Sequence, residues 1–312
     1  MPDALRIATR RSALALWQAE HVASLLRQAH PSLAIELVPM VTQGDRVQDR
    51  ALAQVGGKGL FVKELEVALE EHRADLAVHS MKDVPSELPP GFEIAASLPR
   101  ANPFDAFVSL RHHSFRDLPH AARLGTSSPR RQAQLRAARP DLELELLRGN
   151  VDTRLRRLQE GRLDAILLAC AGLERLGLER HITEVLGTDV AVPAVGQGVI
   201  GVECRDDDAA TVARLAPLHD SSTHTRLVAE RAFARELHGS CHSPIAAHAD
   251  FEGLQLKVIG FVGSPDGGET YRDVIVGAPR DAELLGRELA RRVASAGAGP
   301  LLDRLRREAA DT

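Results

Sequence analysis

The fold is decided by the stretch from Arg123 to Gln159, which reads RLGTSSPRRQAQLRAARPDLELELLRGNVDTRLRRLQ. Its pattern predicts a strand over residues 123–125, a helix over 129–138, a strand over 142–147 and a helix over 151–159. Pro129 suits the first position of a helix, and Ser128 suits the cap before it. Short strands that alternate with helices are typical of α/β domains with largely parallel sheets.

The same alternation extends in both directions from this stretch. Strands are predicted over residues 5–8, 34–41 and 75–79, and helices over 12–28 and 60–72. Strands over 106–110 and 165–168 complete a second unit after a Pro-rich linker at 99–105. A strand over 199–203 is a candidate to pair back onto the first unit. In that case two crossings would join the units, which is a hinge-like arrangement.

The character of the chain changes near Ser221. A helix over 225–237, three strands over 245–251, 254–262 and 270–276, and a helix over 281–294 predict a smaller α+β domain. The predicted domains are therefore 1–98 with 199–216 (α/β), 104–192 (α/β, rich in arginine) and 221–312 (α+β).

Composition excludes several classes of protein. The 312 residues are 44% hydrophobic, but only 3% aromatic, and the net charge is −4. A nucleic-acid binder needs an excess of basic residues and aromatic side chains on which bases stack, so nucleic acid is not expected as a partner. A membrane is not expected either, because no apolar run is long enough to span a bilayer. The N-terminus lacks the pattern of a signal peptide, and three cysteines without a C-x-x-C pair fit a reducing cytoplasm. No metal site is predicted.

An excess of arginine points to an anion site. Residues 123–157 hold nine arginines against four acids, and the segments 125–131 and 148–150 each join a strand end to a helix start. Backbone N–H groups at such junctions bind carboxylates or phosphates, and ligands of open α/β sheets bind there. Arginine at these ends therefore favours a binding site for a polycarboxylate or polyphosphate. The alternative interpretation is a solvated helical face whose arginines form surface ion pairs.

Lysine is rare, since all but four of the 39 basic residues are arginine. Lys82 and Asp83 adjoin directly after a strand, where a carboxylate beside cations can stabilise a positive centre in a substrate. The alternatives are a surface ion pair of little energy and a Schiff base on Lys82. Lys58 lies in a Gly-rich stretch that lacks P-loop spacing and is interpreted as a hinge or lid.

Cys241 lies in a Gly/Ser/Pro loop between His238 and His242, whereas Cys170 and Cys204 lie in or beside apolar strands and are predicted to be structural. The loop setting suits a reactive thiolate. On spacing alone, Cys241 remains open to four interpretations: a nucleophile, a metal ligand, an attachment point or an ordinary loop cysteine.

Seven motifs together resemble the hydroxymethylbilane synthase (porphobilinogen deaminase) family. In order along the chain they are RIATR (6–10), VGGKGLFVKELE (55–66), HSMKDVP (79–85), GTSSPRR (125–131), LRGNV (147–151), PAVGQG (193–198) and the Cys241 loop. The resemblance implies two hinged α/β domains like type II periplasmic binding proteins, plus a small α+β C-terminal domain. A cytoplasmic monomer is expected.

The resemblance further implies a dipyrromethane cofactor, one per chain, joined by a thioether to Cys241. On that primer the family polymerises four porphobilinogen molecules and releases a linear tetrapyrrole by hydrolysis. Asp83 matches the catalytic acid. The implied cofactor contacts are Cys241, Lys82, Asp83, Thr126, Ser127, Ser128, Arg130, Arg131 and Arg154. The implied substrate contacts are Arg10, Ser12, Gln18, Lys58, Arg148, Gly149, Arg154 and Arg175.

Overall fold

The computed structural model describes residues 4–42, 62–239 and 243–310. These residues pack as two compact units. The first contains the described residues up to 42 together with 62–101 and 198–224, and the second contains 102–197 and the described residues from 225 onward. Within the described residues, the chain therefore passes from one unit to the other near residues 101 and 198, and again within a helix near residue 224.

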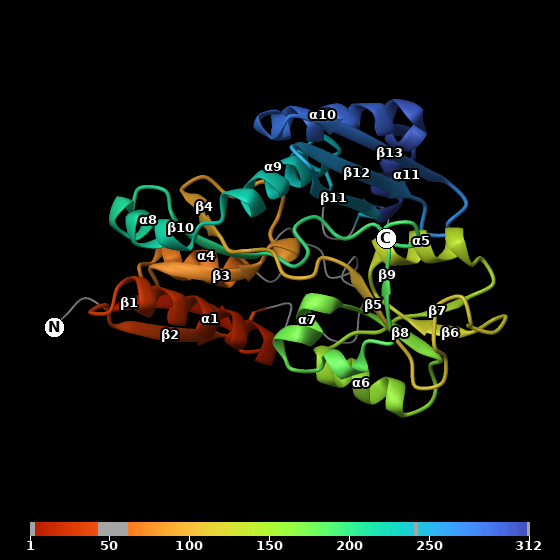
Figure 1. The fold of residues 1–312 in the computed structure, drawn as a ribbon, viewed down its shortest axis with the longest axis horizontal. Helices are drawn as coiled ribbons and strands as arrows, with labels where there is room; N and C mark the ends of the chain where they lie inside the picture. The colour runs from red at the N-terminus through yellow and green to blue at the C-terminus, as the bar shows by residue number, and fades with distance from the viewer. Residues whose placement is uncertain (1–3, 43–61, 240–242, 311–312) are drawn as a thin grey trace. The chain divides into compact units, whose positions relative to one another are not determined.

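The first unit is built on a five-stranded sheet in the order β2-β1-β3-β10-β4 (Figure 1). The strands are β1 (Leu5–Arg10), β2 (Ile35–Met40), β3 (Leu76–Ser80), β4 (Phe92–Ser97) and β10 (Ile200–Arg205). β1, β2 and β3 run parallel, and β10 lies antiparallel between β3 and β4. The expected return of a strand near 199–203 to the first unit is confirmed.

Helices cover both faces of this sheet because its strands carry apolar side chains on both sides. Helix α1 (Ala13–Ala29), capped by Ser12 as predicted, buries Val22 and Leu26 against strand residues of one face. Helix α8 (Ala209–Leu215) and the turn after it add to the same core. Helix α4 (Lys63–Glu70) packs Leu65 and Leu69 against the other face.

The second unit contains a sheet of the same kind, in the order β7-β6-β8-β5-β9. The strands are β5 (Asp105–Val108), β6 (Arg123–Gly125), β7 (Glu143–Glu145), β8 (Ala165–Ala169) and β9 (Glu184–Leu186). β6 runs parallel to β7 and β8, whereas β5 is antiparallel to β8. Helix α5 (Pro129–Ala138) contributes to the core of one face, and α6 (Val151–Gln159) and α7 (Cys170–Arg175) to the other.

A three-stranded antiparallel sheet completes the second unit. It consists of β11 (Ile245–Glu252), β12 (Gln255–Gly263) and β13 (Thr270–Gly277), with α9 (Ser221–Glu236), α10 (Ala282–Val293) and α11 (Gly299–Ala310) in its core. Figure 1 shows α10 lying along this sheet. Ala133 of α5 packs with Ile259 and Phe261 of β12, which explains why residues from 225 onward group with 102–197.

The predicted fold class, two α/β parts followed by an α+β part, is confirmed. Several boundaries differ from expectation, and two of them have a visible cause or consequence. Helix α9 begins at Ser221, where the Asp220 carboxylate accepts hydrogen bonds from Ser222 Oγ and Thr223 N, rather than at residue 225. Strand β7 is shorter than predicted, and Leu146 after it is 49% exposed. The Gly-rich stretch around Lys58, interpreted as a hinge or lid, lies outside the described residues.

Candidate functional site

In the first unit, predicted site residues gather at one edge of the sheet. The carboxyl ends of the parallel strands β1 and β3 lie side by side, so Arg10 and Ser12 on one connection are near Ser80 on the next. Ser12 Oγ accepts a hydrogen bond from Ala15 N at 3.3 Å and starts α1. Gln18, 2% exposed, donates from Nε2 to Ser80 Oγ at 2.8 Å. Gln18 therefore holds α1 against the end of β3.

The Lys82–Asp83 pair lies in a single 3₁₀ turn, Met81–Asp83, directly after β3. Met81 N donates to Val199 O at 3.0 Å, and Val84 N closes the turn onto Met81 O at 3.2 Å. Lys82 and Asp83 are both half-buried. The Asp83 carboxylate forms no hydrogen bond or ion pair with any residue that the structure describes. It is consequently available to a ligand.

In the second unit, the strand-to-helix junctions form as the sequence predicts. Ser128 caps α5 by accepting from Arg131 N at 3.4 Å, and its own N–H donates to Thr126 Oγ1 at 3.3 Å. Asn150 caps α6, and Gly149 before it has φ +109°, a conformation that suits glycine. The half-buried Ser127 lies between the two ordered hydroxyls. Both junctions follow the parallel strands β6 and β7, so they share one edge of the sheet.

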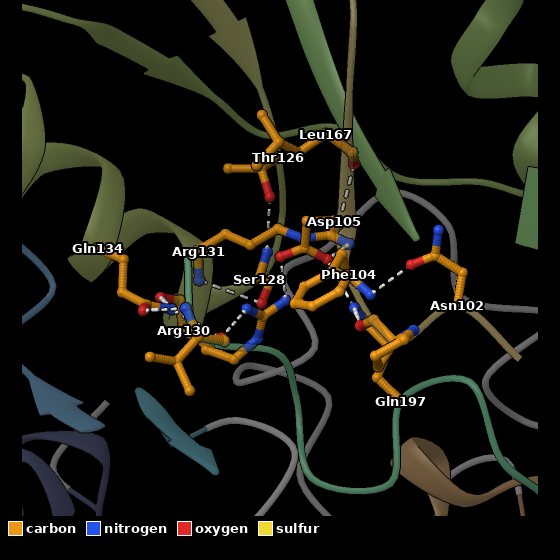
Figure 2. Close-up of polar contacts among 12 residues, drawn as sticks. Asn102, Phe104, Asp105, Thr126, Ser128, Arg130, Arg131, Gln134, Leu167 and Gln197 are labelled. Carbon is orange, nitrogen blue, oxygen red and sulfur yellow. Dashed lines mark hydrogen bonds and ion pairs between the residues drawn. The ribbon is translucent and has the colours of Figure 1, made fainter. Parts of the chain in front are cut away.

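Arg130 and Arg131 point inward and share one carboxylate, that of Asp105 (Figure 2). Each guanidinium lies 2.7 Å from a separate oxygen of Asp105, and each also donates to a backbone carbonyl, Val192 O at 2.6 Å or Leu167 O at 2.9 Å. Both arginine side chains are 6% exposed, and that of Asp105 is fully buried.

Electrostatics keep this cluster ionised. Burial alone would raise the pKa of Asp105, but the charges of Arg130 and Arg131 outweigh it and hold that pKa well below its usual range. That Arg130 and Arg131 contact a cofactor remains a prediction. Such a contact would use the guanidinium N–H groups that do not bind Asp105. Arg131 Nε is one such group, since it is buried without a hydrogen-bond partner among the described residues.

Three other predicted arginines lie at or after strand ends of the second unit. Arg148 is 7% exposed, and burial lowers its pKa. Burial likewise lowers the pKa of Arg175, at the end of α7, to about 10. Arg154 Nε donates to Gly149 O at 2.8 Å, which ties α6 to its own cap. A guanidinium that is removed from water loses the solvation energy of its charge. A bound carboxylate compensates for that loss, so these arginines favour carboxylate ligands.

The cysteines separate into two kinds. Cys170 and Cys204 are both fully buried, and burial raises the pKa of each thiol to about 12. Their predicted structural character is confirmed. Cys241 and Lys58 lie outside the described residues.

Sequence reasoning missed the residues that anchor the PAVGQG motif. Gln197 Nε2 donates to Asp105 Oδ1 at 2.9 Å and to Pro103 O at 2.6 Å. Glu230, 0% exposed on α9, accepts from Gly196 N at 2.7 Å and from Ala249 N at 2.8 Å. The only sequence signal was the presence of an acid or an amide within an otherwise apolar setting.

No helix in the described part of the chain combines the length and apolar character required for a membrane span. Within the same residues, no group of three or more His, Cys, Asp or Glu side chains is arranged to hold a metal ion.

Comparison with known proteins identifies relatives over nearly the whole chain. Residues 5–213 match the family described as "Porphobilinogen deaminase, dipyromethane cofactor binding domain", and residues 224–295 match "Porphobilinogen deaminase, C-terminal domain". Porphobilinogen deaminases of Stenotrophomonas maltophilia strains K279a and R551-3 are 55% and 54% identical over 301 residues, which is 96% of this chain and 99% of each relative. Among solved structures, the methionine-binding protein MetQ is 14% identical with a TM-score of 0.47, covering 72% of this chain and 93% of that one.

Proposed function

This chain belongs to the porphobilinogen deaminase family, and we propose that it catalyses the hydroxymethylbilane synthase reaction. In that reaction four porphobilinogen molecules lose ammonia and join head to tail on a covalent dipyrromethane, and hydrolysis then releases linear hydroxymethylbilane. The observation that carries the proposal is the half-buried Asp83 carboxylate, which no described residue engages and which follows Lys82 on a turn held by backbone hydrogen bonds.

Asp83 is the proposed catalytic residue. When porphobilinogen loses ammonia, positive charge develops on the pyrrole system, and a fixed carboxylate stabilises charge of that sign. The same oxygen atoms can accept a hydrogen bond from a pyrrole N–H and move a proton as the new bond forms. The neighbouring Lys82 is proposed to bind a cofactor carboxylate rather than to form a Schiff base.

The arginines are proposed to hold the acetate and propionate groups that every pyrrole carries. Arg10 supplies a cation at the edge of the first sheet, and Arg148, Arg154 and Arg175 supply cations at the edge of the second. Ser12, Gln18 and Gly149 lie at the same edges and are proposed substrate contacts. Lys58, in the proposed lid, would add a further cation.

The described residues fit a carboxylate-bearing dipyrromethane. The cap of α5 offers the hydroxyls of Thr126, Ser127 and Ser128, and Arg131 keeps a buried Nε for an acceptor. When bound, this group supplies the pyrrole carbon to which the first substrate is joined. We propose Cys241 as its attachment point, because the thiols of Cys170 and Cys204 are buried and their pKa values of about 12 disfavour thiolate formation.

From the sequence we also propose a cytoplasmic monomer that acts on a small molecule and binds neither nucleic acid nor membranes. Two properties support the expectation about nucleic acid, namely the net charge of −4 and the aromatic content of 3%.

Intact-mass analysis of the purified protein tests the proposal. We expect an adduct of two pyrrole units that digestion maps to Cys241, and loss of both adduct and activity in Cys241→Ser. In a cofactor-loaded protein, Asp83→Ala should nearly abolish porphobilinogen consumption, while Asp83→Glu, which keeps the carboxylate, should retain more. An active protein whose mass equals that of its residues would refute the covalent primer, and full activity in Asp83→Ala would refute the role of Asp83.

A further inference from the structure

A second ionisable cluster lies near the Met81–Asp83 turn, called here the catalytic turn, on the face of the first sheet that α4 covers. His79 on β3 and Glu203 on β10 meet there, with His79 Nε2 2.7 Å from Glu203 Oε2. Their side chains are 4% and 0% exposed. His79 belongs to the HSMKDVP motif, but nothing in the proposed chemistry uses it.

The burial of Glu203 makes this contact electrostatically necessary. Among the described residues, no donor is aligned to hydrogen-bond either carboxylate oxygen of Glu203. A buried carboxylate without donors is unfavourable unless a positive charge or a proton neutralises it. The contact that the structure gives this carboxylate is the His79 ring, 2.7 Å away.

Glu66 on α4 is coupled electrostatically to the same two groups. Burial and the charge of Glu203 raise the pKa of Glu66 to about 7, while the charges of His79 and Lys63 act in the opposite direction. Glu66 closes the VGGKGLFVKELE motif, so the cluster joins two motifs that the sequence shows only separately. Glu64 is the other acid in the first turn of α4.

The remaining charge on this face is committed elsewhere. Arg205, two residues after Glu203 on β10, donates to Leu69 O at 2.8 Å, to Ala74 O at 3.1 Å and to Asp208 Oδ2 at 2.9 Å.

Strand geometry connects His79 to the catalytic turn. Side chains alternate along β3, so His79 and Met81 face the same way. His79 pairs across the sheet with Gly201, and a Cβ at Gly201 would come within 2.1 Å of Met81 Sδ. Met81, 1% exposed, thus fills the space that Gly201 leaves beside the His79–Glu203 pair. Met81 opens the turn that ends at Asp83.

We propose that His79 is a positioning residue for the Lys82–Asp83 turn: its buried contact with Glu203 fixes the end of β3, from which that turn begins. The inference rests on the proposed function, since it concerns the placement of the proposed catalytic carboxylate.

Glu203→Gln tests the contact between His79 and Glu203. We expect kcat to fall about ten- to a hundredfold, because small misplacement of a catalytic group has effects of that size, while KM changes by less than about threefold. Far-UV circular dichroism and the cofactor adduct mass must match those of the wild type. A folded, cofactor-loaded Glu203→Gln protein with unchanged kcat would refute the inference and leave the proposed function standing. A cofactor-loaded wild type that does not consume porphobilinogen would refute both.

Discussion

Replacement of Asp105 by asparagine should cause a large loss of stability although it changes only one atom type. The substitution keeps the size of the side chain and removes the charge that Arg130 and Arg131 share. An asparagine oxygen can still accept from one guanidinium. Its NH₂ group then faces the other guanidinium, which is also a donor.

The magnitude follows from the burial of the three groups. Both guanidinium side chains are 6% exposed and the carboxylate is 0% exposed, so water cannot replace the lost partner. Loss of one partner from a buried ion pair costs about 3–5 kcal/mol, because the remaining charge stays desolvated. Asp105 compensates two such charges, which places the expected loss in the upper part of that range.

Urea unfolding followed by far-UV circular dichroism, on Asp105→Asn and wild type, measures this loss. Asp303→Asn is the matched control, because Asp303 pairs with Arg306 at 2.9 Å but is 65% exposed, and pairs of that kind contribute less than about 1 kcal/mol. The pKa of Asp105 in the folded protein is below its ordinary value, so its contribution exists above that ordinary value and disappears only in strong acid. The difference should therefore be constant around neutral pH. A loss within about 1 kcal/mol of the control would refute the reasoning.

Two further substitutions probe packing and titration. Gly286→Ala should destabilise the protein by about 1–3 kcal/mol in urea unfolding, because the new Cβ would lie 2.1 Å from Ala229 O. Gly299→Ala is the control and should not destabilise the protein, because its Cβ would meet only contacts of 3.4 Å or more. Equal effects of the two substitutions would contradict the packing argument. The pKa of Glu66 is raised from 4.5 to about 7 on folding, so wild-type stability relative to Glu66→Gln is greatest below pH 4.5 and declines as the pH rises through 7. With its partial solvent exposure taken into account, the decline should be about 1–2 kcal/mol, and a difference that does not vary with pH would disprove it.

Local signals were enough to predict where helices and strands begin. Ser128 and Pro129 fixed the start of α5, and Ser12 fixed that of α1, because capping depends on residues within one turn. The strand pattern correctly placed Thr126 directly after β6, whereas Arg148 lies three residues beyond the end of β7. The start of helix α9 was predicted four residues too late because Asp220 and Ser221, which start it, are polar and lack an apolar periodic pattern.

The direction of the arginines could not be predicted in the same way. Arg130 and Arg131 turn inward because Asp105 enters from an antiparallel strand 25 residues earlier in the chain, and no local pattern indicates that pairing. His79 and Glu203 are more distant still, and they meet only because β10 inserts beside β3. Hydrophobic periodicity cannot predict pairs of residues that are brought together only by the order of strands in a sheet. The assignment of Asp83 came from the resemblance to a family.

The buried state of Cys170 and Cys204 has a practical consequence for preparing this protein. Under native conditions at neutral pH, a maleimide or iodoacetamide should find both sulfurs sheltered and protonated, which leaves Cys241 as the one position to be labelled. If a thioether occupies that position, it cannot react, so the reagent incorporated per mole of chain would count the molecules that never acquired their primer. A simple labelling ratio could thus grade each batch before any kinetic work begins.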